Sequence, residues 1–139
     1  MKILFMCVEN SARSQMAEGL ARKLFGQKAE IESAGSKPSK LNPLAMKALR
    51  EVGIDITDRH SKSVGHLSPR FLVGLDYVIT LCAEEICPVT ITQAKKLHWA
   101  FPNPTDGGGS LTDEFQRFRD VRDGIQLKLH EFIRELQAK

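Results

Sequence analysis

The sequence predicts a single α/β domain, spanning residues 1–139, built on a central parallel sheet of four or five strands with helices on both faces. The chain has 139 residues, the usual length of one domain. Short apolar runs that suit buried strands alternate with longer segments whose apolar residues recur at helical spacing. Such alternation is typical of parallel strands joined by helical crossovers. Ligands of these sheets bind at the carboxyl ends of the strands, so a functional site is expected there.

The first half of the chain supplies two strands and two helices. Residues 3–6 form a short apolar run, and residues 15–25 carry apolar side chains at helical spacing. A second strand is expected over residues 29–35, where a glycine ends it. The next helix has Asn42 as its expected N-cap, proline at its first position, and Gly53 as its end.

The second half is expected to add two or three strands and a long final helix. A loop from residue 54 leads into a third, more polar strand near residue 64, and a short helix begins at Ser68. Residues 76–82 are the clearest strand, and residues 95–101 form the last one. After the Pro- and Gly-rich segment 102–109, Ser110 or Thr112 caps the final helix. One apolar stripe of that helix is expected to face the sheet: Phe115, Phe118, Val121, Ile125, Leu129, Phe132, Ile133 and Leu136.

A polar loop between the first strand and the first helix carries the chemistry. Cys7 ends the strand, and Arg13 follows after five residues. Strand, loop and helix N-terminus aim backbone N–H groups at one spot, which suits a tetrahedral oxyanion. The same positive field favours a thiolate at Cys7, and Arg13 offers the anion a bidentate partner. The anion-binding residues are then Val8, Glu9, Asn10, Ser11, Ala12, Arg13 and Ser14. Because Cys-x5-Arg alone is a weak pattern, an inert buried cysteine is the alternative.

Composition narrows the function classes. The chain has 20 basic and 17 acidic residues, a net charge of +3, with no long basic run, so no nucleic-acid partner is expected. No stretch is long enough to span a membrane, and the apolar run near the N-terminus is too short for a secretory signal. We therefore expect a cytoplasmic protein with free thiols. The three cysteines argue against a static disulfide framework.

Residues 7–19, Cys-Val-Glu-Asn-Ser-Ala-Arg-Ser-Gln-Met-Ala-Glu-Gly, resemble the opening of thioredoxin-coupled arsenate reductases, which share the fold of low-molecular-weight protein tyrosine phosphatases. The resemblance continues over nearly the whole chain, at residues 32–35, 42–43, 51–56, 78–82, 87–88, 98–99 and 115–123. The Thr-Leu-Cys strand end at Cys82, followed by Cys87 and a proline, separates these reductases from the phosphatases. The resemblance implies that fold, a role in arsenic detoxification, and arsenate as the substrate.

The resemblance also implies roles for individual residues. Cys7 would attack arsenate held by the loop amides and Arg13, while Ser14 hydrogen-bonds the thiolate. Cys82 would then attack Cys7, releasing arsenite, and Cys87 would move the disulfide to Cys82–Cys87 for reduction by thioredoxin. Two thiols that become one disulfide supply the two electrons that arsenic(V) must accept. No tightly bound cofactor is implied, apart from a potassium ion that some members hold.

Three departures from the family pattern concern the site. In the family, an Asp-Pro pair in the loop after the last strand supplies the general acid, and here Asn103 and a proline stand in its place. A carboxamide cannot donate a proton as an acid does. Asp106 lies nearby in the sequence and could substitute. Cys82 and Cys87 are separated by only four residues, a short span for a transfer that needs Cα atoms within about 4.4–6.8 Å.

The third departure concerns potassium. Asn10, Glu18 and Ser33 match three of the family's four ligands, but Lys62 stands where the fourth, an aspartate, aligns. The Lys62 ammonium could replace the ion, or the site could be absent.

Two alternatives to the reductase remain at the level of sequence. A phosphatase acting on a phosphoester would need only Cys7 and Arg13. The lack of an acid at Asn103 would slow a phosphatase more than a reductase, because the leaving group of the ester must be protonated. A thiol sensor or zinc module could use Cys7, Cys82 and Cys87 with His98. Otherwise His98 reads as structural.

Overall fold

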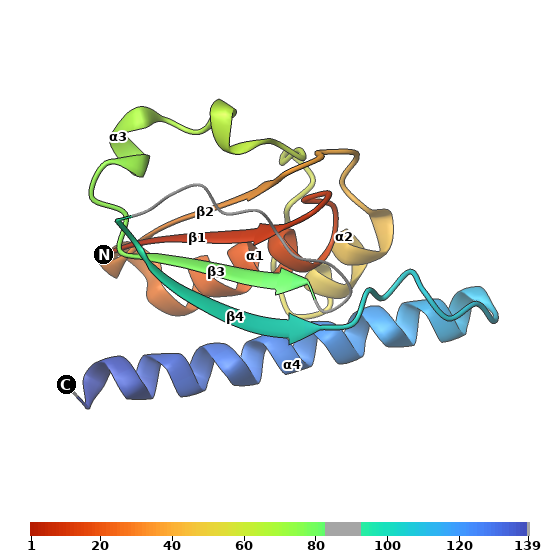
Figure 1. Cartoon of the computed structure of the whole chain (residues 1–139). Helices are drawn as coiled ribbons and strands as arrows, with labels where there is room; N and C mark the ends of the chain where they lie inside the picture. The colour runs from red at the N-terminus through yellow and green to blue at the C-terminus, as the bar shows by residue number, and fades with distance from the viewer. Residues whose placement is uncertain (83–92, 139) are drawn as a thin grey trace.

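The computed structural model describes residues 1–82 and 93–138, and these residues form one four-stranded parallel sheet with helices on both faces. The strands are β1 (Lys2–Cys7), β2 (Glu30–Gly35), β3 (Tyr77–Cys82) and β4 (Lys95–Phe101), in the order β2-β1-β3-β4. Figure 1 shows the four arrows running side by side. β1 lies between two neighbours and is buried on both faces from residue 3 onward, as its apolar run predicts.

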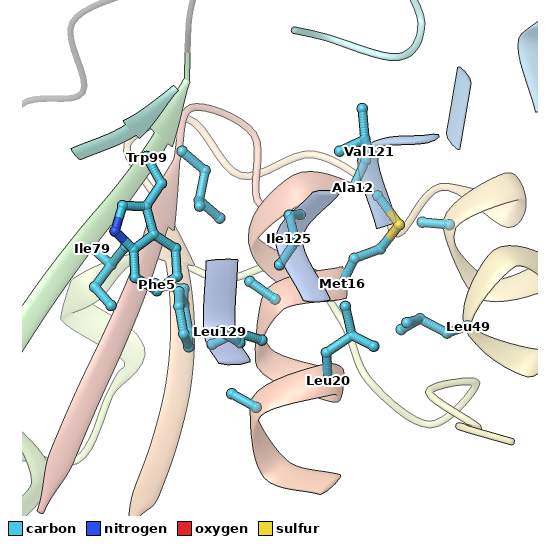
Figure 2. Close-up of a cluster of buried hydrophobic side chains, with 14 of the residues drawn as sticks. Phe5, Ala12, Met16, Leu20, Leu49, Ile79, Trp99, Val121, Ile125 and Leu129 are labelled. Atoms are coloured by element: carbon cyan, nitrogen blue, oxygen red, sulfur yellow. The ribbon is translucent and has the colours of Figure 1, made fainter. Parts of the chain in front are cut away.

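Three helices cover one face of the sheet: α1 (Arg13–Phe25), α2 (Pro43–Arg50) and α4 (Leu111–Gln137). They enclose the main core, in which Phe5 and Ile79 of the sheet meet Met16, Leu20 and Ile125 of the helices (Figure 2). A smaller core on the other face is closed by the short helix α3 (Pro69–Leu72) and the 3₁₀ turn η2 (Val64–His66); another turn, η1 (Gly26–Lys28), follows α1. In the described residues, no helix is both long and apolar enough to cross a membrane.

The predicted helix caps are confirmed. The Asn42 side chain accepts a 2.8 Å hydrogen bond from the backbone N–H of Leu44, with Pro43 at the first helical position. Ser110, rather than Thr112, caps α4, and it forms a reciprocal capping box with Asp113. The predicted apolar stripe of α4 faces the core, fully buried up to Phe132.

The expected polar strand near residue 64 is wrong. Residues 54–63 form no strand, and their backbone groups instead support the loop after β1. The Lys62 carbonyl accepts from Gly35 N–H at 2.8 Å, and the Lys62 N–H donates to Asn10 Oδ1 at 3.0 Å. In the part of the chain that the structure describes, the sheet therefore has four strands, the lower of the two numbers expected. α2 also ends earlier than expected, at Arg50; Gly53, with φ 81°, closes the turn that follows.

Candidate active site

The loop between β1 and α1 encloses a small cavity of about 60 Å³ at the carboxyl edge of the sheet, where the site was expected. Residues from two segments line it: Cys7, Val8, Glu9, Ser11, Ala12 and Arg13, and from the loop after β4, Asn103 and Thr105. A cavity of this size admits only a compact ligand. The cavity therefore suits a small tetrahedral anion.

The loop turns its backbone carbonyls away from the cavity. The segment after β2 donates three backbone hydrogen bonds to these carbonyls. They run from Lys37 N–H to Val8 (2.8 Å), from Ser39 N–H to Glu9 (3.1 Å), and from Asn42 N–H to Ser11 (2.9 Å). Gly35 permits this close approach, since a Cβ there would lie 2.5 Å from the Val8 carbonyl oxygen. With the carbonyls bonded outward, the loop amides are left for an anion.

Arg13 opens α1 and is buried, with 6% of its surface exposed. Its Nη1 donates a 2.9 Å hydrogen bond to the carbonyl of Phe101, the last residue of β4. The Phe101 ring in turn packs on α4 at Gly124, where a Cβ would come within 2.9 Å of it. The guanidinium is thus oriented by the strand that leads into the loop carrying Asn103.

A chain of side-chain hydrogen bonds runs from the Cys7 sulfur to a buried carboxylate. Ser14 Oγ lies 2.9 Å from Cys7 Sγ, and Asn10 Nδ2 donates to Ser14 Oγ (2.7 Å) and to Ser33 Oγ (3.0 Å). Ser33 donates to Glu18 Oε1 at 2.5 Å. Apart from Cys7, each residue in this series has at most 1% of its surface exposed. Through Asn10 these hydrogen bonds connect Cys7 to Ser33, which lies 23 positions beyond Asn10 in the sequence.

Gln15 is a member of this network that the sequence did not reveal. It is completely buried, and its Nε2 donates to Asn10 Oδ1 at 3.0 Å and to the His60 carbonyl at 3.1 Å. Together with the Lys62 N–H, it occupies Asn10 Oδ1, so the amide of Asn10 must turn its Nδ2 toward the two serines. The only available signal was a glutamine placed among the apolar positions of α1.

Cys82 ends β3 beside Cys7, and the two buried thiols pack together with Val8. The pKa of Cys7 is raised well above its usual value by a hydrogen bond with Cys82 and by burial, while Ser14 acts in the opposite direction. The contact with Cys82 and the burial both oppose the thiolate that the field of the loop was expected to favour at Cys7. Cys87, the third cysteine expected in the site, lies outside the described residues.

The two acid-loop candidates lie in different surroundings. Asn103 lines the small cavity with Cys7 and also a neighbouring groove of about 470 Å³ between the loop and α4, whereas Asp106 lines the groove and not the cavity. Arg117 of α4 holds the loop by donating from Nε to the Pro104 carbonyl at 3.0 Å. Asp106 is therefore not among the residues that line the cavity with Cys7.

The expected potassium ligands also lie together, but cations of the protein surround them. The Glu18 carboxylate pairs with Arg59 and with Arg22 Nε at 2.9 Å, and Lys62 Nζ lies 3.6 Å from it. Burial lowers the pKa of the Lys62 ammonium, although the nearby Glu32 opposes this.

Among the described residues, no group of three or more His, Cys, Asp or Glu side chains could hold a metal ion; Cys87, a member of the zinc alternative, lies outside them. His98 is engaged otherwise, because its Nδ1 lies 2.6 Å from Thr80 Oγ1.

Comparison with known proteins agrees with this geometry. The family model for low molecular weight phosphotyrosine protein phosphatase matches residues 2–139. The arsenate reductase of Oceanobacillus iheyensis is 40% identical over 134 residues, which cover 95% of this chain and 94% of the relative. The arsenate reductase of Bacillus subtilis is 41% identical over 132 residues, 94% of this chain and 93% of the relative.

Solved structures give the same result. An arsenate reductase in the reduced state superposes with a TM-score of 0.76 at 28% identity, covering 97% of this chain and 98% of that one. The thioredoxin-dependent arsenate reductase of Corynebacterium glutamicum superposes with a TM-score of 0.73 at 28% identity, covering 99% of this chain, which spans 62% of that longer chain.

Proposed function

The chain belongs to the low molecular weight phosphotyrosine protein phosphatase family, and we propose that it is an arsenate reductase whose thiol cascade is reduced by thioredoxin. One observation carries the proposal: a second thiol, Cys82, packs against the Cys7 thiol at the edge of an anion-sized cavity. Hydrolysis of a phosphoester uses only one thiol. Reduction needs a second thiol within reach of the first.

The first step balances without a general acid. The Cys7 sulfur bonds to arsenic, and the thiol proton leaves with a hydroxyl of arsenate as water. The loop amides and Arg13 stabilise the charge on the remaining oxygens, as donors to a developing oxyanion do. The site therefore tolerates a carboxamide at Asn103 in place of the family's acid.

The second step transfers the electrons. The Cys82 sulfur attacks Cys7, a Cys7–Cys82 disulfide forms, the sulfur–arsenic bond breaks, and arsenic leaves as arsenite with the electron pair and the Cys82 proton. Cys87 then displaces Cys7 from Cys82, which restores the Cys7 thiol. Thioredoxin reduces the Cys82–Cys87 disulfide and becomes oxidised itself.

For the possible ion site, we propose that cations of the chain replace potassium. Lys62 and two arginines already surround the Glu18 carboxylate, and a metal ion beside three cationic groups would be repelled. The residues present do not fit a potassium ion. No step of the reaction is assigned to one.

Arsenite release measured with thioredoxin, thioredoxin reductase and NADPH tests the proposed function. We expect turnover by the wild type and none by Cys7→Ser. For Arg13→Ala we expect a raised KM and a lowered kcat, because the contacts of the guanidinium strengthen as charge develops. Hydrolysis of p-nitrophenyl phosphate is the comparison reaction. Rapid hydrolysis without any arsenite release would favour the phosphatase instead.

A further inference from the structure

The loop after β4 carries Asn103 in place of the family's acid, and hydrogen bonds hold this loop on both sides of Asn103. It starts at the Phe101 carbonyl, which accepts from Arg13, and it is fastened to α4 through Arg117 and the Pro104 carbonyl. Within it, Asp106 N–H donates to the Asn103 carbonyl at 3.1 Å, closing a turn. The loop therefore presents its side chains to the cavity from a fixed backbone.

The Asn103 carboxamide has its oxygen occupied inside this turn. Asn103 Oδ1 accepts from Thr105 N–H at 3.1 Å and from Thr105 Oγ1 at 2.8 Å. A carbonyl oxygen has two lone pairs, so both are used. The other end of the amide, Nδ2, carries two N–H donors, and no group of the described residues accepts a hydrogen bond from it.

Asn103 and Thr105 line the same cavity as Cys7 and Arg13. On the premise of the proposed function, we infer that Asn103 is a specificity-determining residue whose Nδ2 donates a hydrogen bond to the bound oxyanion, with Thr105 holding the amide in that orientation. The donor is neutral and cannot protonate a leaving group. The cavity then favours an inorganic tetrahedral oxyanion, whose own hydroxyl group can leave as water, over a phosphate monoester.

Charge acts in the same direction. One acidic residue, the exposed Glu9, is already among those that line the cavity. An aspartate at residue 103 would add a second carboxylate and would repel a dianion, whereas the carboxamide adds only hydrogen-bond donors. A pocket with Asn103 therefore binds the anion more strongly at the cost of ester hydrolysis.

Binding of inorganic phosphate, measured by calorimetry, tests the inference without any turnover, so it remains decidable even if arsenate reduction fails. We expect Asn103→Ala to weaken phosphate binding about 10-fold or more, as for a hydrogen bond to a charged group. Asn103→Asp should weaken it at least as much, while raising hydrolysis of p-nitrophenyl phosphate by up to about 10²–10⁴-fold. Thr105→Val, which keeps the backbone contact, should weaken binding about 2- to 10-fold.

Asp106→Asn is the matched comparison, because it changes a carboxylate of the same loop outside the cavity. Its phosphate affinity should stay within about twofold of the wild type. Unchanged affinity in both Asn103→Ala and Thr105→Val, or tighter binding in Asn103→Asp, would overturn the assignment of Asn103. A loss in Asp106→Asn as large as in Asn103→Ala would overturn it too.

Discussion

Asn10 donates a 2.7 Å hydrogen bond to the hydroxyl of Ser14, and this contact sets the direction in which Ser14 acts on Cys7. The hydroxyl accepts from the amide, so its own proton is free to point at the Cys7 sulfur 2.9 Å away. A donor to sulfur favours the thiolate over the thiol. The network therefore supports ionisation of Cys7, whereas Cys82 opposes it.

Substitutions at the two neighbours should move the pKa of Cys7 in opposite directions. Ser14→Ala removes a contact that lowers the pKa, so the pKa should rise further. Cys82→Ala removes the largest cause of the raised value, so the pKa should fall. Because the thiolate is the reactive form, the midpoint of Cys7 alkylation by iodoacetamide should shift to higher pH in Ser14→Ala and to lower pH in Cys82→Ala. Mass spectrometry of the Cys7 peptide follows the reaction, and a shift of both midpoints in one direction would contradict this account.

Gln15 should matter both for stability and for the nucleophile. Gln15→Leu keeps the residue's approximate volume but leaves Asn10 Oδ1 and the His60 carbonyl without one donor each. Asn10 Oδ1 keeps the Lys62 N–H as a donor, so the lost hydrogen bonds of Gln15 should lower the free energy of unfolding in urea by about 0.5–1.5 kcal/mol. The Cys7 alkylation midpoint should also rise, because the Asn10 amide is no longer locked.

Gln116→Leu is the control, since Gln116 is exposed on α4 and bonds only other surface side chains. It should change neither quantity. If Gln15→Leu lost stability with an unmoved midpoint, Gln15 would have a merely structural role.

The sequence predicted the parts of the site that are local in the chain. Cys7 and Arg13 flank one strand–loop–helix unit, and its chemistry follows from residue order alone. The pKa of Cys7 could not be anticipated, because it depends on Cys82, which is distant in sequence and adjacent only once β1 and β3 pair. The strand expected near residue 64 does not form, and the Lys62 N–H and carbonyl bond instead to Asn10 Oδ1 and to the Gly35 N–H, two partners that the local sequence pattern does not indicate.

Helical periodicity has a similar limit. It identifies the buried side of α1, but it does not tell which polar residue on that side has partners. The partners of Gln15 are Asn10, in the loop after β1, and the carbonyl of His60. Neither partner belongs to α1, so the pattern of that helix does not indicate them.

Lys62 provides a test of the replaced ion. The wild type should melt at the same temperature in equal concentrations of KCl and NaCl, because the carboxylate of Glu18 already has protein cations around it. Lys62→Met should lower the free energy of unfolding by about 1–3 kcal/mol, since it removes one cation from a carboxylate that is 2% exposed. Lys128→Met, which breaks an exposed pair with Glu131, should cost less than about 1 kcal/mol. Specific stabilisation of the wild type by potassium would contradict the replacement.

The second and third cysteines separate the reductase from the phosphatase most directly. A phosphatase would not need Cys82 or Cys87, whereas the cascade needs both in order. Cys87→Ser should perform a single turnover and stop with Cys7 joined to Cys82, because no thiol remains to release Cys7. Cys82→Ser should release little arsenite, since a serine cannot form the first disulfide. Mass spectrometry of protein digested without reductant, after one equivalent of arsenate, identifies the linked pair. Normal turnover by both serine variants, with no Cys82–Cys87 disulfide in the wild type, would leave the phosphatase as the better description.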